Sequence, residues 1–207
     1  MFYRYLIAGA IGCACPTAFA QATLADFESG LPIGWSTSGS AWTFGGATAT
    51  SPNVLPPQGA QFARSGAPNV VSGALAESLT GTLTSKGFIV SYDTLQWLAA
   101  GWSGQFNNGL SRFEILDQSF AVKATVSAPL TDSWVTQSVN LLSSGLSAGS
   151  TFYFRAVDGN FANNYSWLAA DNLHLVGAPV PEVGAQLLML CGGTLITLAI
   201  RRRKRNP

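Results

Sequence analysis

Cysteine is scarce in this sequence, and its positions exclude two kinds of structure. Only three cysteines occur among 207 residues. Cys13 and Cys15 lie in an apolar N-terminal segment, and Cys191 lies in an apolar run near the C-terminus. Residues 21–178 therefore contain no cysteine, which excludes an internal disulfide and a thiol nucleophile there. A domain formed by these residues depends on its hydrophobic core alone.

Catalytic motifs are also absent. The sequence has one histidine, His174, in the segment "NLHL", and no His-Glu-x-x-His or Cys-His pattern. The stretch "GWSGQFNNG" carries no lysine, so it does not match a phosphate-binding loop. Two carboxylates about 5 to 10 Å apart would suit glycoside hydrolysis, but the sequence singles out no such pair. We therefore predict a protein that is not an enzyme and has no catalytic residues.

Charged side chains are few, and acidic ones outnumber basic ones outside the two ends of the chain. Residues 21–178 contain nine acidic and five basic residues, a net charge of −4, whereas the whole chain has +1. An acidic domain lacks the surplus cations that release counterions from phosphate groups. Nucleic acid is therefore excluded as a partner, and nothing in these residues requires a cofactor.

The first 20 residues have the three parts of a secretory signal peptide. Arg4 provides a short positive region, residues 6–14 an apolar region, and "AFA" at 18–20 a small-residue cleavage pattern before Gln21. Lipid attachment at Cys13 in "AIGC" is the alternative, but leucine is missing three positions upstream. We predict a signal peptide over 1–20 and export of the remainder.

An apolar run and a basic cluster close the sequence. Residues 183–200 would form a helix of roughly 27 Å at about 1.5 Å per residue, close to the thickness of a bilayer's hydrocarbon core. A buried C-terminal helix is the alternative, but it would not end in five cations. Clusters of basic residues beside a membrane span stay on the cytoplasmic side of the membrane. We predict a transmembrane helix over 183–200, with residues 21–178 outside and a cytoplasmic end formed by Arg201, Arg202, Arg203, Lys204 and Arg205.

Together with the N-terminal signal, this tail resembles a known sorting signal. The apolar run is preceded by Val180, Pro181 and Glu182. The order of parts is similar to the PEP-CTERM signal of Gram-negative bacteria, although Val183 stands where that signal usually has a second proline. The resemblance implies that an exosortase-type enzyme processes residues 179–207 of a precursor anchored in the inner membrane. It also implies a final place at the cell surface or in the extracellular matrix, associated with exopolysaccharide, flocs or biofilm.

Residues 21–178 show the periodicity of β-strands. The stretch "FAVKATV" alternates in polarity, while "RFEILDQ", "WVTQSVNLL" and "TFYFRAVD" are rich in β-branched and aromatic residues. Clusters of Gly, Pro, Ser and Asn separate such runs. Together they predict an all-β domain, an antiparallel β-sandwich of the jelly-roll type. Further strands are expected at 22–27, 41–45, 60–64, 76–84, 88–98 and 167–176.

Short motifs lie toward both ends of the domain: Phe27-Glu28, Leu31-Pro32, Gly34-Trp35, Trp134 before "VNL", Phe152 to Arg155, and Asp171-Asn172-Leu173. They resemble the motifs of choice-of-anchor J modules, which are exported jelly rolls related in architecture to MAM and concanavalin-like sandwiches. Carbohydrate-binding jelly rolls of this architecture often hold a structural Ca²⁺ between the first and last strands. The resemblance therefore points to Glu28 and Asp171 as Ca²⁺ ligands, because Ca²⁺ prefers carboxylate oxygens. The alternative is that both cap turns or pair with Arg155.

Six tryptophans are many for a domain of this size, and aromatic rings stack on sugars. We expect four of the six in the core and two, Trp102 and Trp167, exposed for a ligand. Asn163 and Asn164 would hydrogen-bond sugar hydroxyls beside them. Two functions follow: a non-enzymatic surface or matrix protein that associates with exopolysaccharide, or alternatively a specific carbohydrate-binding module.

Overall fold

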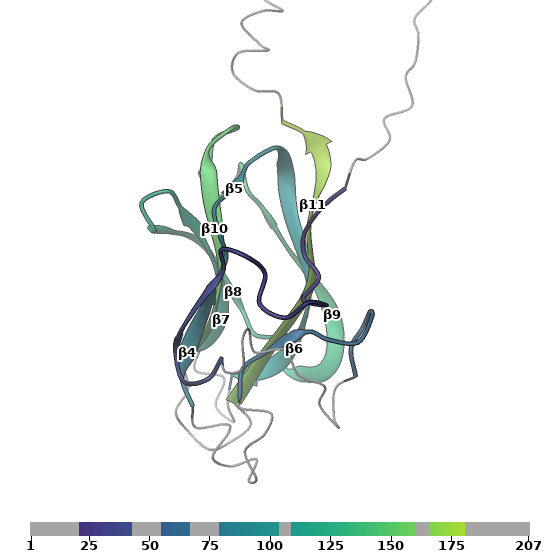
Figure 1. Ribbon diagram of the computed structural model, residues 1–207. Helices are drawn as coiled ribbons and strands as arrows, with labels where there is room; N and C mark the ends of the chain where they lie inside the picture. Colours follow the sequence, from purple (N-terminus) through teal and green to yellow (C-terminus); the bar gives the residue numbers. More distant parts are fainter. Residues whose placement is uncertain (1–20, 43–54, 67–78, 104–108, 160–165, 181–207) are drawn as a thin grey trace, which may run out of the picture.

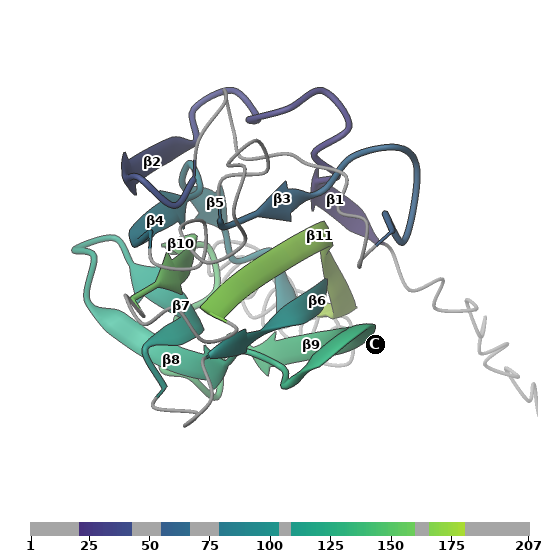
Figure 2. The same ribbon diagram turned by 90° about the horizontal axis from the view of Figure 1, so that it is seen from below.

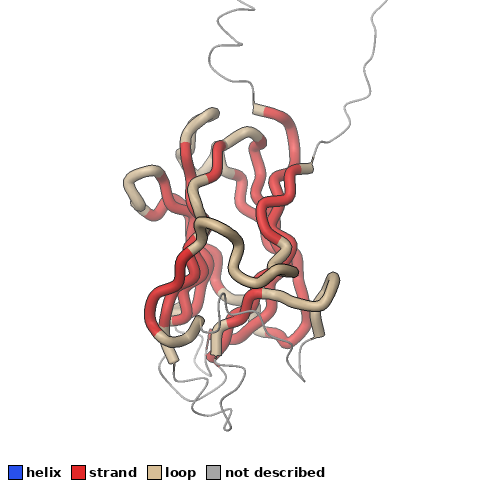
Figure 3. The backbone as a smooth tube through the Cα atoms, viewed as in Figure 1, coloured by secondary structure: helices blue, strands red, loops and turns tan. Residues whose placement is uncertain are grey.

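The computed structural model of the protein describes residues 21–42, 55–66, 79–103, 109–159 and 166–180, which form two facing β-sheets (Figures 1 and 3). Every regular element in these ranges is a β-strand, and every strand pairing is antiparallel. The antiparallel β-sandwich predicted from the sequence is confirmed. The predicted signal peptide and the predicted transmembrane helix lie outside these ranges. Within them, no helix is long and apolar enough to span a bilayer.

The first sheet, called sheet A, contains both ends of the described chain. Its strand order is β1-β11-β6-β9, and the short strand β3 also pairs with β11. Figure 2 shows β11 between β1 and β6, with β9 at the far side. The strands are β1 (Ala22–Ala25), β3 (Ala63–Arg64), β6 (Tyr92–Ser103), β9 (Thr131–Asn140) and β11 (Ser166–Pro179).

The second sheet, called sheet B, packs against sheet A. Its order is β2-β4-β10-β7-β8, and the two-residue strand β5 pairs with β10. The strands are β2 (Ser36–Gly39), β4 (Gly81–Thr84), β5 (Phe88–Ile89), β7 (Ser111–Asp117), β8 (Val122–Ser127) and β10 (Thr151–Asp158).

The core lies between the sheets and follows from the two-residue period of the strands. In β10 every second residue is buried, beginning with Phe152 and Phe154. Trp97 of β6 reaches across from sheet A, and its ring lies 5.3 Å from Phe113 and 5.4 Å from Phe154 between centroids, near edge-to-face. Such aromatic pairs add to the stabilisation that burial provides. This packing holds the two sheets together in a domain without disulfides.

The first and last strands lie side by side, as expected. Residues of β1 pair with the middle of β11, in the register Ala22 to Leu175 and Thr23 to His174. Leu173 and Leu175 are buried, and His174 between them is half-buried on the outer side. A bulge interrupts the pairing of β11 with β6 between Asp171 and His174. This bulge brings Asp171 to the junction of the two chain ends.

Two of the expected strands differ from the structure, and one strand was not expected. A strand was expected at 41–45, but Ala41 and Trp42 follow β2 as a bend, and 43–45 lie outside the described residues. The strand β2 itself was missed because "STSG" is exposed throughout and shows no apolar alternation. The expected strand at 88–98 is divided into β5 and β6, because β5 pairs with β10 of sheet B whereas β6 belongs to sheet A. The chain changes sheets at Val90-Ser91.

Gly101 of β6 occupies a backbone conformation that suits glycine alone. Its φ is 142°, at a register shift between β6 and β9. A Cβ there would overlap the backbone of Trp167 and lie 3.0 Å from the Cα of Leu168. Gly145 also has a positive φ, 85°, but an added Cβ would meet nothing within 4 Å.

The substitution Gly101→Ala should therefore cost more stability than Gly145→Ala. We expect a loss of about 1 kcal/mol for Gly145→Ala from backbone strain, and of about 3 kcal/mol for Gly101→Ala, where a collision adds to the strain. Urea unfolding measures both. Equal losses for the two variants would show that β6 and β11 do not approach so closely at Gly101.

Candidate functional site

An aromatic cluster lies on the outer face of sheet A, opposite the core. It consists of Phe62, Trp102, Trp134 and Trp167 around Ala100 and Ala169, and we call it the outer aromatic cluster. The period of β6 and β11 explains it: Ala99 and Leu168 face the core, so their neighbours Ala100 and Trp167 face outward. Trp102 and Trp167 are paired in register across the two strands.

Two tryptophans of this cluster are half-buried, and each is fixed by a hydrogen bond. The indole nitrogen of Trp102 donates to Oδ1 of the exposed Asp132 at 3.0 Å. The indole nitrogen of Trp134 donates to the carbonyl oxygen of Leu55 at 2.7 Å. The ring of Trp134 also packs edge-on against Phe62, with 5.1 Å between centroids. Both rings therefore keep one orientation while part of their surface faces solvent.

The expectation that Trp167 is exposed is wrong. Only 4% of its surface is exposed, and the guanidinium carbon of Arg64 lies 4.8 Å from its ring centroid. The ring is covered because β3 pairs with β11 and brings Arg64 beside it. Trp102 is half-buried, and Asn163 and Asn164 lie outside the described residues. Four of the six tryptophans are buried, as expected, but Trp134 takes the place assigned to Trp167.

The candidate metal ligands lie at the junction of β1 and β11. Asp171 is 1% exposed, and its Oδ1 accepts a hydrogen bond from the backbone nitrogen of Asn172 at 2.7 Å. Its Oδ2 is buried and has no hydrogen-bond partner among the described residues. Burial, together with the nearby carboxylates of Glu28 and Asp26, raises the pKa of this carboxyl from 3.8 to about 7, although the hydrogen bond from Asn172 acts in the opposite direction.

Glu28 holds the loop before β3 in place through hydrogen bonds. Its carboxylate accepts hydrogen bonds from the backbone nitrogens of Ala60 at 2.8 Å and Gln61 at 3.3 Å. Neither Glu28 nor Asp171 pairs with Arg155, which binds Glu114 instead. Two non-glycine residues beside this junction have positive φ, Phe27 at 55° and Asn172 at 49°. In the described ranges, no three or more His, Cys, Asp or Glu residues are grouped as a metal site.

His174 and Val180, the first residue of the predicted sorting signal, each make a hydrogen-bond contact with the backbone. The Nδ1 of His174 lies 2.7 Å from the carbonyl oxygen of Asn172, within the bulge of β11. The backbone nitrogen of Val180 donates to the carbonyl oxygen of Ser91 at 2.9 Å, which ties the end of β11 to the start of β6. Pro181, Glu182 and the basic residues 201–205 lie outside the described ranges.

Sequence reasoning missed Trp134, Asp132 and a charged group on the outer face of sheet B. Asp132 gave no signal, because its contact with Trp102 joins residues 30 positions apart. Trp134 was read only as part of a family motif. On sheet B, Arg112 and Glu114 are two residues apart and so share a face of their strand, which is a signal that the sequence did carry.

Comparisons with known proteins identify the fold. No known protein-family model and no curated protein matches the chain. Among solved structures it is similar to the K1 cleaved adhesin domain of Lys-gingipain from Porphyromonas gingivalis W83, with a TM-score of 0.50, 12% identity, and coverage of 78% of this chain and 99% of that one. The K2 domain of Lys-gingipain has a TM-score of 0.50 and 13% identity, with coverage of 77% of this chain and 99% of that one. TmCBM61 in complex with β-1,4-galactotriose has a TM-score of 0.48 and 15% identity, with coverage of 73% of this chain and 94% of that one. At these identities the likeness to the two adhesin domains shows the fold alone, a β-sandwich.

Proposed function

We propose that this protein is a non-enzymatic, exported surface or matrix protein whose β-sandwich contacts polysaccharide through the outer aromatic cluster. One observation carries the proposal: Trp102 and Trp134 are half-exposed on the same sheet face, and hydrogen bonds hold both indoles in place. A ring that is already fixed loses little conformational entropy when it stacks on a sugar. Exposed Asp132 beside Trp102 offers a carboxylate that accepts hydrogen bonds from sugar hydroxyls.

The proposed localisation depends on the two ends of the chain. The signal peptide would direct export, and the PEP-CTERM-like tail would hold the precursor in the inner membrane until an exosortase-type enzyme removes it. Val180 is the last described residue, and its hydrogen bond to Ser91 closes the sandwich directly before the tail. Cleavage beyond this point would leave the described strands intact and release the domain to the cell surface or matrix.

Fractionation tests the address. The full chain should pellet with the inner membrane, and a chain that ends after residue 180 should be recovered in the soluble fraction. The physical reason is that removal of 183–200 removes an apolar span of bilayer length. If the shortened chain still pelleted with membranes after a high-salt wash, the sandwich itself would be the membrane-binding part and the proposed anchor would be wrong.

A glycan array tests the outer aromatic cluster. Saturable binding to a neutral glycan should fall about fivefold or more on Trp102→Ala and on Trp134→Ala, since stacking on one aromatic ring contributes on the order of 1 kcal/mol or more. Ile33→Ala is the matched control, because Ile33 is 95% exposed and lies in the β1–β2 connection. A bound glycan that is retained equally by all three variants would place its site elsewhere. Silence across the array would favour a purely structural matrix role.

We also propose that the junction of β1 and β11 holds a Ca²⁺ ion. The residues fit in one respect: Oδ2 of Asp171 is a buried carboxylate oxygen without a described donor, and a hard cation would satisfy it. Glu28 is the second carboxylate at this junction. Backbone carbonyls and water would complete the ligands. Such an ion would stabilise the charged form of Asp171 and fasten the first strand to the last.

Stability measurements in Ca²⁺ and in chelator test this site. With chelator, the raised pKa of Asp171 means that its contribution to stability is complete below pH 3.8 and is lost as the pH rises through about 7. At pH 8, millimolar Ca²⁺ should restore stability and raise the Tm by a few degrees, since a hundredfold excess over Kd is worth about 2.7 kcal/mol.

Two variants give this measurement its controls. Asp171→Asn should abolish the Tm difference between Ca²⁺ and chelator and flatten the pH dependence. Asp132→Asn, which changes an exposed carboxylate away from the junction, should preserve both. Superimposable melting curves for the wild-type protein in Ca²⁺ and in chelator would remove the metal site and leave Asp171 as a buried turn residue.

A further inference from the structure

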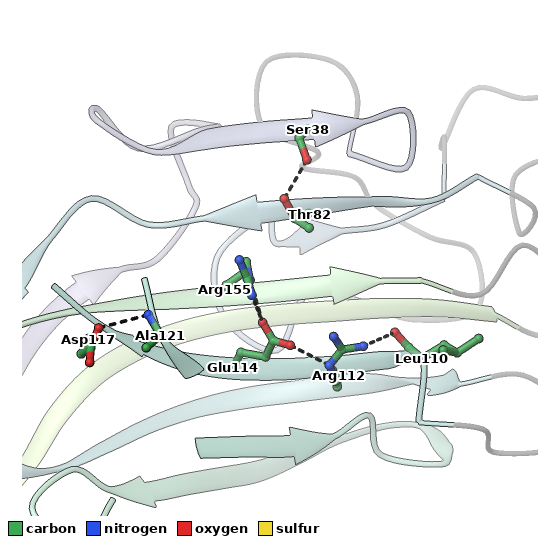
Figure 4. Close-up of polar contacts among 8 residues, drawn as sticks. All are labelled: Ser38, Thr82, Leu110, Arg112, Glu114, Asp117, Ala121 and Arg155. Carbon is green, nitrogen blue, oxygen red and sulfur yellow. Dashed lines mark hydrogen bonds and ion pairs between the residues drawn. The ribbon is translucent and has the colours of Figure 1, made fainter. Parts of the chain in front are cut away.

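The outer face of sheet B carries two arginines that share one buried carboxylate. Glu114 of β7 is 2% exposed, and its Oε1 accepts from Nε of Arg112 at 2.7 Å. Its Oε2 accepts from Nε of Arg155 on β10 at 2.6 Å, and Nη2 of Arg155 also contacts it. Figure 4 shows the three side chains in a row across the two strands. Both oxygens of the carboxylate are therefore occupied by guanidinium groups.

This group keeps a net positive charge and unused donors. Two guanidinium groups and one carboxylate sum to +1, and each arginine has five N–H donors. Arg112 uses Nε for Glu114 and Nη1 for the carbonyl oxygen of Leu110, and Arg155 uses Nε and Nη2 for Glu114. The side chains of the two arginines remain 30% and 28% exposed. Nη2 of Arg112 and Nη1 of Arg155 have no partner among the described residues.

Hydroxyl groups flank the arginines on both sides. In the register of sheet B, Thr84 lies opposite Arg155, and Thr125 lies opposite Glu114. Ser127 lies opposite Arg112. Further along this face, the hydroxyls of Ser38 and Thr82 share a hydrogen bond of 2.9 Å (Figure 4). This face therefore presents hydrogen-bond donors and acceptors around the two arginines.

An aromatic platform stands beside this centre. Tyr153, two residues before Arg155, lies on the same side of β10, and its ring stacks on Phe120 with 4.4 Å between centroids and 23° between planes. Phe120 is 53% exposed and has φ of 62°, which is unfavourable for a phenylalanine. The turn is held in this shape by Asp117, whose Oδ1 accepts hydrogen bonds from Ser119 and Ala121. The backbone is therefore strained at Phe120, although the ring of this residue is partly exposed to solvent.

We propose that this face binds an acidic polysaccharide, one that carries uronate carboxylates. A guanidinium group can bind a carboxylate through two parallel hydrogen bonds. Because Glu114 already fixes the side chains of Arg112 and Arg155, little side-chain entropy is lost when a ligand binds. The flanking hydroxyls suit a glycan backbone, and Tyr153 with Phe120 suits the face of a sugar ring. A small inorganic anion would use the arginines alone and gain nothing from these neighbours.

The inference shares with the proposed function only the general class of ligand. It assigns a different face, made of sheet B residues, and a charged rather than a neutral glycan. The outer aromatic cluster lies on sheet A, on the other side of the core. Loss of one site therefore leaves the other testable, and variants of Trp102 report on the proposed function while variants of Arg112 and Arg155 report on this inference.

The probe is polygalacturonate, with its fully methyl-esterified form as the uncharged counterpart, measured on the full-length protein captured on a biosensor surface. We expect binding to polygalacturonate that weakens as salt is added, and at least tenfold weaker binding to the ester. Arg112→Gln and Arg155→Gln should each weaken binding about tenfold, and Tyr153→Ala severalfold. Trp102→Ala should leave it unchanged.

Lys123→Gln is the matched charge control. It removes one positive charge from the neighbouring strand β8, where Nζ of Lys123 lies 3.6 Å from Oδ2 of Asp117. This variant should change binding no more than twofold. Arg155→Lys keeps the charge but loses the fork, and should be weaker than wild type while folding normally, which keeps the test valid if Arg155→Gln does not fold. Equal binding of the acid and its ester, equal losses in Lys123→Gln and the arginine variants, or no binding to polygalacturonate would each overturn the inference.

Discussion

The pairing of β11 with three other strands is the constraint on which the rest of the structure depends. This 14-residue strand lies between β1 and β6 and also pairs with β3. It closes sheet A with the first and last described strands side by side. Its inward residues belong to the core that Trp97 shares with Phe113 and Phe154. Since residues 21–178 have no cysteine, this register and this core hold the described strands together without a disulfide.

The same constraint separates two surfaces of different chemistry. Because side chains alternate along a strand, the residues that do not enter the core are presented on the outer faces of the two sheets. The outer face of sheet A carries the outer aromatic cluster, with Trp102 and Trp134 half-exposed. On sheet B the outward residues are charged and hydroxylated, with Arg112 and Arg155 around buried Glu114. The sandwich between them keeps the two faces apart, so the two proposed glycan sites can be tested independently.

The sequence predicted the sandwich well where local period and burial agree, and poorly where they do not. β10 was identified as a strand from the aromatic and β-branched residues of "TFYFRAVD", and in the structure every second residue of this strand is buried. β2 has no buried residue, and its place in sheet B comes from pairing with β4, far along the chain. Trp167 was assigned to solvent because no local pattern shows that Arg64, from a distant strand, covers its ring. The link from Glu114 to Arg155 spans 41 residues and was invisible for the same reason.

Hydroxyl-radical footprinting of the full-length protein with and without polygalacturonate tests the separation of the two faces most directly. Radical attack reports the solvent exposure of individual aromatic side chains. The account predicts that Phe120 and Tyr153 become protected when the acidic glycan is present, while Trp102 and Trp134 are oxidised as before. Protection of Trp102 and Trp134 with Phe120 and Tyr153 unchanged would contradict it, because acidic glycan would then occupy sheet A.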